Sequence, residues 1–464
     1  MKKFTLVFGL FLLKSLVFAQ KNEILVFEEY LKTVSQNHPT VKQADARISQ
    51  AFFNVMASRG AFDPVLASSQ DLKTLDSKNY YNHQSTELKV LTPFGLGFKT
   101  GVEKSNGAFV NPEYTPGTLT YLGVELPVLK GLLIDQQRAQ FQVSKQMSLF
   151  SEAEKASVVN DLMLDAAVSY WEWAGAYLIL ENLNENLINA QERAALVKIG
   201  FTNGDKSAAD TLEAQSQVQS IILAKEEALT FFQSQKITLA RFIWSEEQVP
   251  YLLAENVVPD TRRFVTLYES ENIDDLIKGL ATFHPDLRQY TFKLSSLEID
   301  RKLKFQSMLP ELKLKANLLS KDFYSFKSSY SPYLTNNYKF GFDFKLPLLL
   351  REGRGKVKVA DFKISETKLQ LQEKTWYIEN KVLQYDTEMR GLGRQIEAAS
   401  QMFQNYNRLL GIEQLKFFQG ESSLFVLNSR QNKLLDAQVK LQKLKTKYLQ
   451  TYYKVLWSAG RLTE

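Results

Sequence analysis

The sequence lacks cysteine altogether and has only three histidines among 464 residues. Without cysteine there is no disulfide framework, no thiolate zinc site, no thiol nucleophile and no lipidated cysteine. His38, His83 and His284 are too few to supply a histidine-rich metal centre or a proton relay well. No Gly-Lys-Ser/Thr phosphate loop, His-Glu-x-x-His or Gly-x-Ser-x-Gly motif occurs either. We therefore expect a protein that is not an enzyme and has no resident metal or cofactor.

One glycine-rich stretch and two His-Pro pairs could carry binding chemistry, but their contexts favour structural roles. The stretch 351–355, Arg-Glu-Gly-Arg-Gly, lacks the preceding strand and the glycine spacing of a dinucleotide site. We expect it to be the loop that begins a long helix. His38 and His284 each precede a proline, which is tolerated in the first turn of a helix. We expect both histidines at helix starts rather than on a metal.

The first nineteen residues are predicted to be a secretory signal peptide. Lys2 and Lys3 precede an apolar run, and Val17-Phe18-Ala19 suits cleavage before Gln20. A membrane-anchoring helix is the alternative, but Lys14 interrupts the run and leaves it short of about 20 apolar residues. Removing the segment takes away three lysines and no acid, so the formal net charge falls from +6 to +3 (6 − 3 = 3). Such weak basicity gives no case for nucleic-acid binding.

Strict alternation of apolar and polar residues predicts strands in the second half of the chain. From 337 to 346 one side carries Tyr338, Phe340, Phe342, Phe344 and Leu346, and the other carries Lys339, Gly341, Asp343 and Lys345. The stretch 311–318 alternates likewise, and a polar loop, 325–332, lies between the two. After the signal no apolar run approaches the length of a transmembrane helix, so we expect membrane-spanning β-strands, with Tyr338, Phe340, Phe342 and Phe344 facing lipid. A half-buried hairpin of a soluble protein would show the same period.

Most of the remaining chain is predicted to form unusually long helices. The stretch 134–198 contains no proline and one glycine, and at about 1.5 Å per residue it would form a rod near 100 Å long. The stretch 356–410 is also free of proline. Between 212 and 242, and again between 424 and 455, apolar residues recur mainly at spacings of three, four and seven, which is typical of coiled-coil seams. The other faces are polar, as expected of a thin-walled assembly rather than a globular core.

The chain also repeats itself once. His38-Pro39 matches His284-Pro285 at an offset of 246, and Pro64 matches Pro310 at the same offset. Leu126-Pro127 matches Leu346-Pro347 at 220, and Gly204 matches Gly420 at 216. Each half therefore runs helix, strand region, Leu-Pro, long helix, glycine turn and shorter helix. The strand region of the first half is longer, which leaves two or four strands possible there.

These landmarks carry a family resemblance over essentially the whole mature chain. In each half an aromatic residue is followed by two residues, a glycine turn and a helix, at Phe201–Gly204 and Phe417–Gly420. Together with Asn37-His38-Pro39 and the two Leu-Pro pairs, this pattern resembles the TolC-like outer-membrane channel proteins, also called outer membrane efflux proteins. The resemblance implies a mainly α protein with a β-barrel portion, in which long coiled-coil hairpins and transmembrane strands of three copies complete one barrel and one tunnel.

The resemblance also implies a function and partners. Such a homotrimer would be the exit duct of a tripartite export system in the outer membrane, for small molecules or for secreted proteins, with a large periplasmic portion. Its partners would be outer-membrane lipid, a periplasmic adaptor and an inner-membrane pump. The residues independently favour oligomerisation. Unpaired edge strands need another strand to pair with, and helices with a single apolar stripe need another helix to cover it. A non-channel periplasmic coiled-coil scaffold is the alternative, but it would not need the alternation at 338–346.

The repeat predicts boundaries for each segment. After the signal peptide, 1–19, the first half comprises a helical segment, 20–64, a strand region, 65–127, and a helical hairpin, 128–246. A linker or equatorial segment follows at 247–272. The second half comprises a helix, 273–309, a strand region, 310–347, and a helical hairpin, 348–464.

The two glycine turns are the predicted docking tips. Each ends the rod that begins after a Leu-Pro pair, and glycine suits a chain reversal with positive φ. The resemblance assigns adaptor docking to Gly204, Asp205, Lys206, Ser207, Gly420, Glu421, Ser422 and Ser423. A plain interhelical turn without a partner is the alternative. Asp205 and Glu421 depart from the apolar or small residues that the family often has there, which puts the choice of adaptor in doubt.

Family channels often narrow at the tip through acidic side chains. Asp210 and Glu213 occupy such places in the first half, whereas the equivalents in the second half are Val426 and Ser429. Any acidic constriction would therefore be thin. The alternative is that both acids are ordinary carboxylates in the first turns of a helix, where the helix dipole favours them.

Overall fold

The computed structural model describes residues 23–269, 272–321 and 337–462. The predicted signal peptide, 1–19, and the predicted polar loop, 325–332, lie outside the described residues. The chain forms two compact units. The helical unit combines Met1–Pro39, Asp161–Glu271 and Leu383–Trp457, and the sheet unit combines Thr40–Asn160, Asn272–Val382 and Ser458–Glu464.

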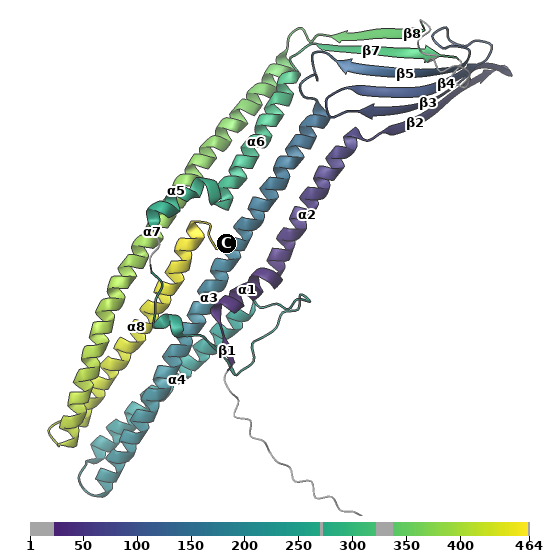
Figure 1. Cartoon of the computed structure of the whole chain (residues 1–464). Coiled ribbons are helices and arrows are strands. Elements are labelled where there is room, and N and C mark those ends of the chain that lie inside the picture. Colours follow the sequence, from purple (N-terminus) through teal and green to yellow (C-terminus); the bar gives the residue numbers. More distant parts are fainter. Residues whose placement is uncertain (1–22, 270–271, 322–336, 463–464) are drawn as a thin grey trace, which may run out of the picture. The chain divides into compact units, whose positions relative to one another are not determined.

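Eight α-helices occur in the described residues (Figure 1). The two longest, α3 and α7, contribute long stretches to both units. Their bounds are α1 Phe27–Asn37, α2 Pro39–Arg59, α3 Gln136–Thr202, α4 Ala208–Ala240, α5 Ile273–Phe283, α6 Pro285–Gln306, α7 Arg351–Phe418 and α8 Leu424–Ser458. The long helices α3 and α7 have 67 and 68 residues, so the predicted rods exist.

Both His-Pro pairs stand at the start of a helix, as predicted, and each also separates that helix from a preceding one, which was not predicted. His38 ends α1, where its backbone N–H donates to Val34 O at 3.1 Å, and Pro39 begins α2. His284 ends α5 and caps α6, because its Nδ1 accepts the backbone N–H of Asp286 at 3.2 Å. The proline that follows occupies the first turn, where its missing N–H costs no helical hydrogen bond.

The core of the helical unit is aromatic. Phe27 of α1 lies 4.7 Å from Trp171 of α3 and 5.0 Å from Tyr453 of α8, measured between ring centroids. Trp171 and Trp173 are fully buried. A short parallel pair joins strand β1, Glu23–Leu25, to strand β6, Val257–Pro259. Large rings fill this junction because each buries more area than an aliphatic side chain.

The glycine-rich stretch 351–355 is helical, so our expectation of a loop there is wrong. Arg351 begins α7 directly after Leu350, whose φ is +53°. A Cβ added to Gly353 would lie 2.6 Å from Cγ of Met308. Glycine at 353 therefore lets the first turns of α7 pack closely on the segment after α6, which the sequence pattern alone did not show.

Six strands form one antiparallel sheet in the order β2-β3-β4-β5-β7-β8 (Figure 1). Their bounds are β2 Val65–Leu75, β3 Lys78–Leu91, β4 Gly97–Asn106, β5 Gly117–Pro127, β7 Glu311–Ser320 and β8 Tyr338–Lys345. The first half thus supplies four strands and the second half two. In the part of the chain that the structure describes, none of the helices combines the length and apolarity needed to cross a membrane.

Helices of the sheet unit are tied together by ion pairs. Arg47 of α2 pairs with Glu154 of α3 at 3.0 Å, and Arg301 of α6 pairs with Asp361 of α7 at 2.6 Å. Asp286, at the start of α6, accepts a hydrogen bond from Ser157 of α3 and pairs with Lys374 of α7 at 2.7 Å. One half-buried carboxylate therefore connects three helices.

Candidate functional site

The six-stranded sheet has two unlike faces. In the strand register, Val90, Phe98, Val124, Ala316 and Phe340 stand opposite one another across five strands. The next row, on the other face, reads Lys89, Lys99, Gly123, Asn317 and Lys339. We call these the apolar face and the polar face. The alternation predicted for 338–346 therefore extends through most of the sheet.

The apolar face is exposed at the edge strand β8. Tyr338, Phe340, Phe342 and Phe344 are each more than half exposed, with 66% of Phe342 accessible. They pair across to Leu318, Ala316, Leu314 and Leu312 of β7. A continuous exposed apolar stripe of this kind is typical of a surface that contacts a membrane or another protein.

The polar face holds internally paired charges. Lys315 Nζ lies 2.5 Å from a carboxylate oxygen of Asp343, and Lys89 Nζ lies 3.7 Å from one of Glu125. The Tyr121 hydroxyl donates to Glu87 at 2.6 Å. Its ring crosses Gly101, where an added Cβ would lie 2.6 Å from the hydroxyl oxygen. Glycine at 101 thus leaves room for a tyrosine to lie across the strand.

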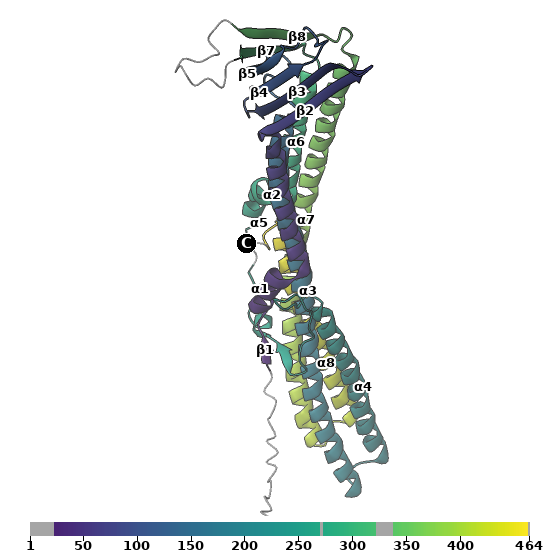
Figure 2. The ribbon, with the colours of Figure 1, turned by 90° about the vertical axis from the view of Figure 1, so that its right-hand side faces the viewer.

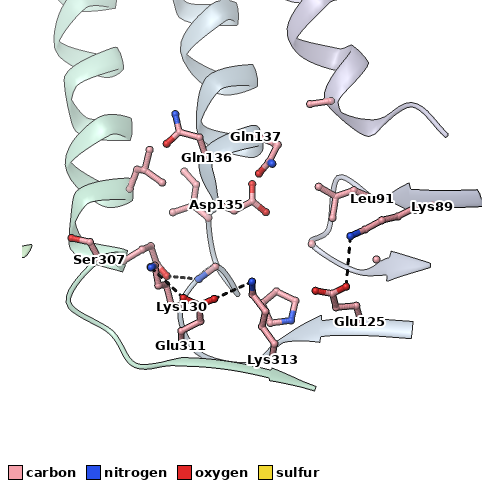
Figure 3. A pocket seen from close by; sticks show the side chains of 18 of the residues that line it. Lys89, Leu91, Glu125, Lys130, Asp135, Gln136, Gln137, Ser307, Glu311 and Lys313 are labelled. Carbon is pink, nitrogen blue, oxygen red and sulfur yellow. Dashed lines mark hydrogen bonds and ion pairs between the residues drawn. The ribbon is translucent and has the colours of Figure 1, made fainter. Parts of the chain in front are cut away.

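A pocket of about 790 Å³, lined by both charged and apolar side chains, lies where the strands of the sheet unit meet its helices (Figure 3). Glu311 accepts from Lys313 at 2.9 Å and pairs with Lys130 at 3.5 Å. The backbone N–H of Gly131 donates to Gln306 Oε1 at 3.1 Å. The remaining labelled carboxylate, Asp135, pairs with Arg138 of α3. Paired charges of both signs therefore surround the pocket and do not select a ligand of one charge.

The two predicted tips have the same backbone. Gly204 and Gly420 have φ of +83° and +80°, and an added Cβ would meet nothing within 4 Å at either. The N–H of Asp205 donates to Gly200 O at 2.8 Å, and the N–H of Glu421 donates to Lys416 O at 2.9 Å. The predicted positive φ is therefore confirmed, since each glycine ends its helix with a left-handed residue.

The helix starts after these turns differ. Ser207 and Asp210 form a capping box, in which Asp210 N–H donates to Ser207 Oγ at 3.1 Å and Ser207 N–H donates to Asp210 Oδ2 at 3.0 Å. These hydrogen bonds from Ser207 lower the pKa of the Asp210 carboxyl. At the second turn, Val426 N–H donates to Ser423 Oγ at 3.4 Å, and Ser422 donates to Glu413. Asp210 thus serves as a helix-start carboxylate, which was one of its two predicted roles.

The two turns pack against each other in the helical unit, where the hairpins α3–α4 and α7–α8 lie side by side (Figures 1 and 2). Lys206 Nζ lies 4.6 Å from the ring centroid of Phe417. Leu424 is buried with Val197 and Ala214. Asp205, Glu421, Ser207 and Ser423 remain exposed, and Lys206 and Ser422 are half-buried. Both predicted tips therefore contribute to one surface.

A partly buried cluster of polar side chains joins the same hairpins, and the sequence analysis did not predict it. Gln217 of α4 donates to Asn432 Oδ1 of α8 at 2.6 Å, and Arg193 of α3 donates to Gln431 of α8. Burial lowers the pKa of Arg193. Glu213, the second predicted constriction residue, accepts from Asn428 of α8 at 3.3 Å. The sequence does show polar residues such as Gln217 and Gln431 within the apolar heptad pattern. Such residues need hydrogen-bond partners when the helices pack, so this pattern could have predicted the cluster.

Comparison with known proteins gives a family match over part of the chain and a shared fold over most of it. Residues 116–243 match the family described as outer membrane efflux protein. No curated protein matches the chain.

Solved structures of outer membrane channels share the fold. The CmeC channel of Campylobacter jejuni is 15% identical, with a TM-score of 0.62 over 94% of this chain and 85% of that one. VceC of Vibrio cholerae is also 15% identical, with a TM-score of 0.62 over 93% and 95%. MtrE of Neisseria gonorrhoeae is 14% identical, with a TM-score of 0.64 over 94% and 90%.

These findings bear on four expectations from the sequence. A mainly helical protein with helical hairpins and a sheet is observed. Because the matched family consists of outer-membrane transport channels, an outer-membrane localisation with a large periplasmic portion and a non-enzymatic role are confirmed. The resemblance to the TolC-like outer membrane efflux proteins is thereby confirmed, in sequence over residues 116–243 and in fold over nearly the whole chain.

Proposed function

We propose that the chain is the outer-membrane exit duct of a tripartite export system and works as a homotrimer. The observation that carries the proposal is the sheet, which has an exposed apolar face, a charge-paired polar face and two edge strands. The ends of its strand order are β2 and β8. Each edge strand presents backbone N–H and C=O groups on one side, and a neighbouring edge can satisfy them.

Three copies would close these edges into one barrel. β2 of one copy would pair with β8 of the next, so that Tyr338, Phe340, Phe342 and Phe344 face lipid and the paired charges line the lumen. This arrangement matches the rule that membrane barrels are apolar outside and polar inside. It also covers all edges, which an isolated sheet cannot do.

Cross-linking and fractionation test the trimer. We expect the protein in the outer-membrane fraction, soluble only in detergent, with a cross-linked band at three times the monomer mass. Recovery of a folded monomer in the soluble fraction without detergent would overturn the proposal and favour a periplasmic coiled-coil scaffold.

The surface formed by the two turns would dock a periplasmic adaptor, which connects the duct to an inner-membrane pump. The proposed contacts are Gly204, Asp205, Lys206, Ser207, Gly420, Glu421, Ser422 and Ser423. Phe418 and Phe425 beside them are 73% and 70% exposed. An exposed surface that combines apolar rings with a few charges suits a protein partner.

A charge reversal tests the docking surface. The double variant Asp205→Lys and Glu421→Lys leaves the glycines untouched but inverts both exposed charges. We expect it to form trimers in the membrane at normal abundance while cross-linking to the adaptor in cells is lost. Reversal of Glu226 and Glu373, two exposed helical glutamates, is the control. Full adaptor cross-linking by the tip variant would show that the turns are only turns.

A thin acidic constriction completes the proposal. Three copies of Glu213, with Asp210 beside its capping serine, would place carboxylates near the tip. Glu213→Gln should then lower the selectivity of the channel for cations over anions in planar bilayers without changing the yield of trimer. An unchanged selectivity would show that Glu213 forms no acidic constriction.

A further inference from the structure

The strand count sets the width of the proposed barrel, on which this inference rests. Six strands in each of three copies give 18 strands (6 × 3 = 18). Barrels of 16–18 strands leave an aqueous channel, because their diameter grows with strand number. The wall of such a barrel does not itself restrict passage. Any restriction at this level must come from residues that lie over the polar face.

One connection does lie over the polar face. The segment 107–116 between β4 and β5, which we call the strap, brings Tyr114 onto His83 of β3. Their rings are stacked at 4.0 Å and 21°. His83 belongs to the polar face, because it stands opposite Asp71 and Ser105 in the row that alternates with the apolar one. His83 and Ser105 are 8% and 2% exposed, and His83 Nδ1 lies 2.8 Å from Ser105 Oγ.

The strap is anchored to β3 at its start and forms a turn of its own before Tyr114. At its start, the N–H of Phe109 donates to Tyr80 O at 2.8 Å, and the two rings lie 5.0 Å apart. Gly107 has a φ of +131°, and an added Cβ would lie 2.6 Å from Tyr80 O. Toward its end, the N–H of Tyr114 donates to Asn111 O at 2.8 Å. These contacts fold the connection back onto β3.

We propose that the strap restricts the exit lumen, and that Tyr114 is the side chain that holds it across the polar face. In the trimer three straps would project inward from the wall. Tyr114 remains 38% exposed, so three aromatic rings would line the restriction and bear on which cargo passes. Because the strap belongs to the strand region, it is separate from the docking turns.

Thiol labelling tests the strap in each copy, and the absence of cysteine makes the chain suitable. In full-length protein, Ser105→Cys should react slowly with a charged maleimide because the position is covered. Adding Tyr114→Ala should speed labelling roughly tenfold by releasing the strap, whereas adding Tyr114→Phe, which keeps the ring, should leave it slow. Ser85→Cys, also on the polar face, is the control whose labelling should be the same in all three backgrounds. If Ser105→Cys were labelled at the same rate in the parent, Tyr114→Ala and Tyr114→Phe backgrounds, the proposal that Tyr114 holds the strap over the polar face would be wrong.

Single-channel recording tests the restriction itself. In planar bilayers Tyr114→Ala should raise the conductance of the full-length trimer roughly twofold, since more of the lumen becomes open. Tyr114→Phe should match the parent. An unchanged conductance in Tyr114→Ala with fast labelling of Ser105→Cys would overturn the restriction. Failure of the trimer would look different, because the parent itself would give no cross-linked trimer and no channels.

Discussion

The two halves of the chain share their backbone landmarks but differ in local chemistry. Gly204 and Gly420 reverse the chain with nearly the same φ, and both His-Pro pairs separate two helices. The strand regions differ, with four strands in the first half and two in the second. The features that recur, the glycine turns and the prolines at helix starts, are those that the backbone conformation requires. The side chains around them differ, so equivalent positions in the two halves should respond unequally to substitution.

The largest difference should appear in the strands. Phe342 in the second half and Gln70 in the first lie on the same face of the sheet. Phe342 is surrounded by apolar residues, whereas Gln70 Nε2 donates to Asn82 Oδ1 at 3.1 Å in a polar part of that face. Phe342→Arg should cost about 2–4 kcal/mol if the site lies near the middle of the bilayer, and Gln70→Arg about 0–1 kcal/mol. Urea unfolding of protein refolded into lipid vesicles measures both.

The opposite face gives the control for this prediction. Asp343→Arg should cost much less than Phe342→Arg, because Asp343 is proposed to face water in the lumen. Equal costs at 342 and 343 would refute the assignment of the two faces.

The next largest difference should appear at the histidines. Burial lowers the pKa of His284 to about 4 and lowers that of His38 as well. The neutral ring of His284 accepts the Asp286 N–H. Because burial disfavours the charged imidazolium, the stabilisation by neutral His284 is complete above the unfolded pKa of about 6.5. It is lost as the pH falls from there toward 4, by about 3 kcal/mol. Hydrogen exchange at the start of α6, followed between pH 7 and pH 4.5, should show this loss.

Asparagine separates titration from capping. His284→Asn keeps an N-cap acceptor but cannot take up a proton, so the acid sensitivity at α6 should disappear. His38→Asn should change the pH dependence less, because His38 is only half-buried whereas His284 is buried, so burial lowers the pKa of His38 by less. A pH profile that His284→Asn leaves unchanged would assign the effect to other groups.

The sequence could predict those elements whose cause is local. The alternation at 338–346 sufficed for β8, because a strand with one apolar face must alternate. The glycine turns were predictable because only positive φ explains glycine after so long a helix. The long helices followed from the absence of proline.

Features that depend on distant partners could not be predicted. Whether the first half has two or four strands depends on pairing between β3 and β4, which the period alone leaves open. The glycines at 353 and 355 suggested a loop, but both lie in α7. At 353 the absence of a side chain lets Met308 pack closely against the helix. The role of Asp210 needed the hydrogen-bond geometry of Ser207. The stacking of Tyr114 on His83 joins residues 31 positions apart (114 − 83 = 31) across a connection without a repeating pattern.

The glycine turns should show how alike the halves are. Gly204→Val and Gly420→Val should each cost about 1–2 kcal/mol, because an L-residue is strained at positive φ while the added side chain meets open space. Thermal unfolding in detergent should give equal losses, and Asn at either site should cost less. A clear inequality would mean that one turn is held by contacts that the other lacks.

The smallest difference concerns the serines after the turns, and here the halves should diverge again. Ser207→Ala removes the capping box and should cost roughly 1 kcal/mol, whereas Ser423→Ala removes a single hydrogen bond of 3.4 Å and should cost a few tenths. The lowered pKa of Asp210 also makes the stability of this helix start depend on pH. Its stabilisation is present above the unfolded pKa of about 3.9 and is lost as the pH falls through the lower folded value. The protection factors of amides in the first turn of α4, measured relative to their intrinsic exchange rates, should therefore fall in acid for the parent. In Ser207→Ala they should already be low at neutral pH and change little. Equal behaviour of the two serine variants would show that the capping box contributes nothing that a lone serine does not.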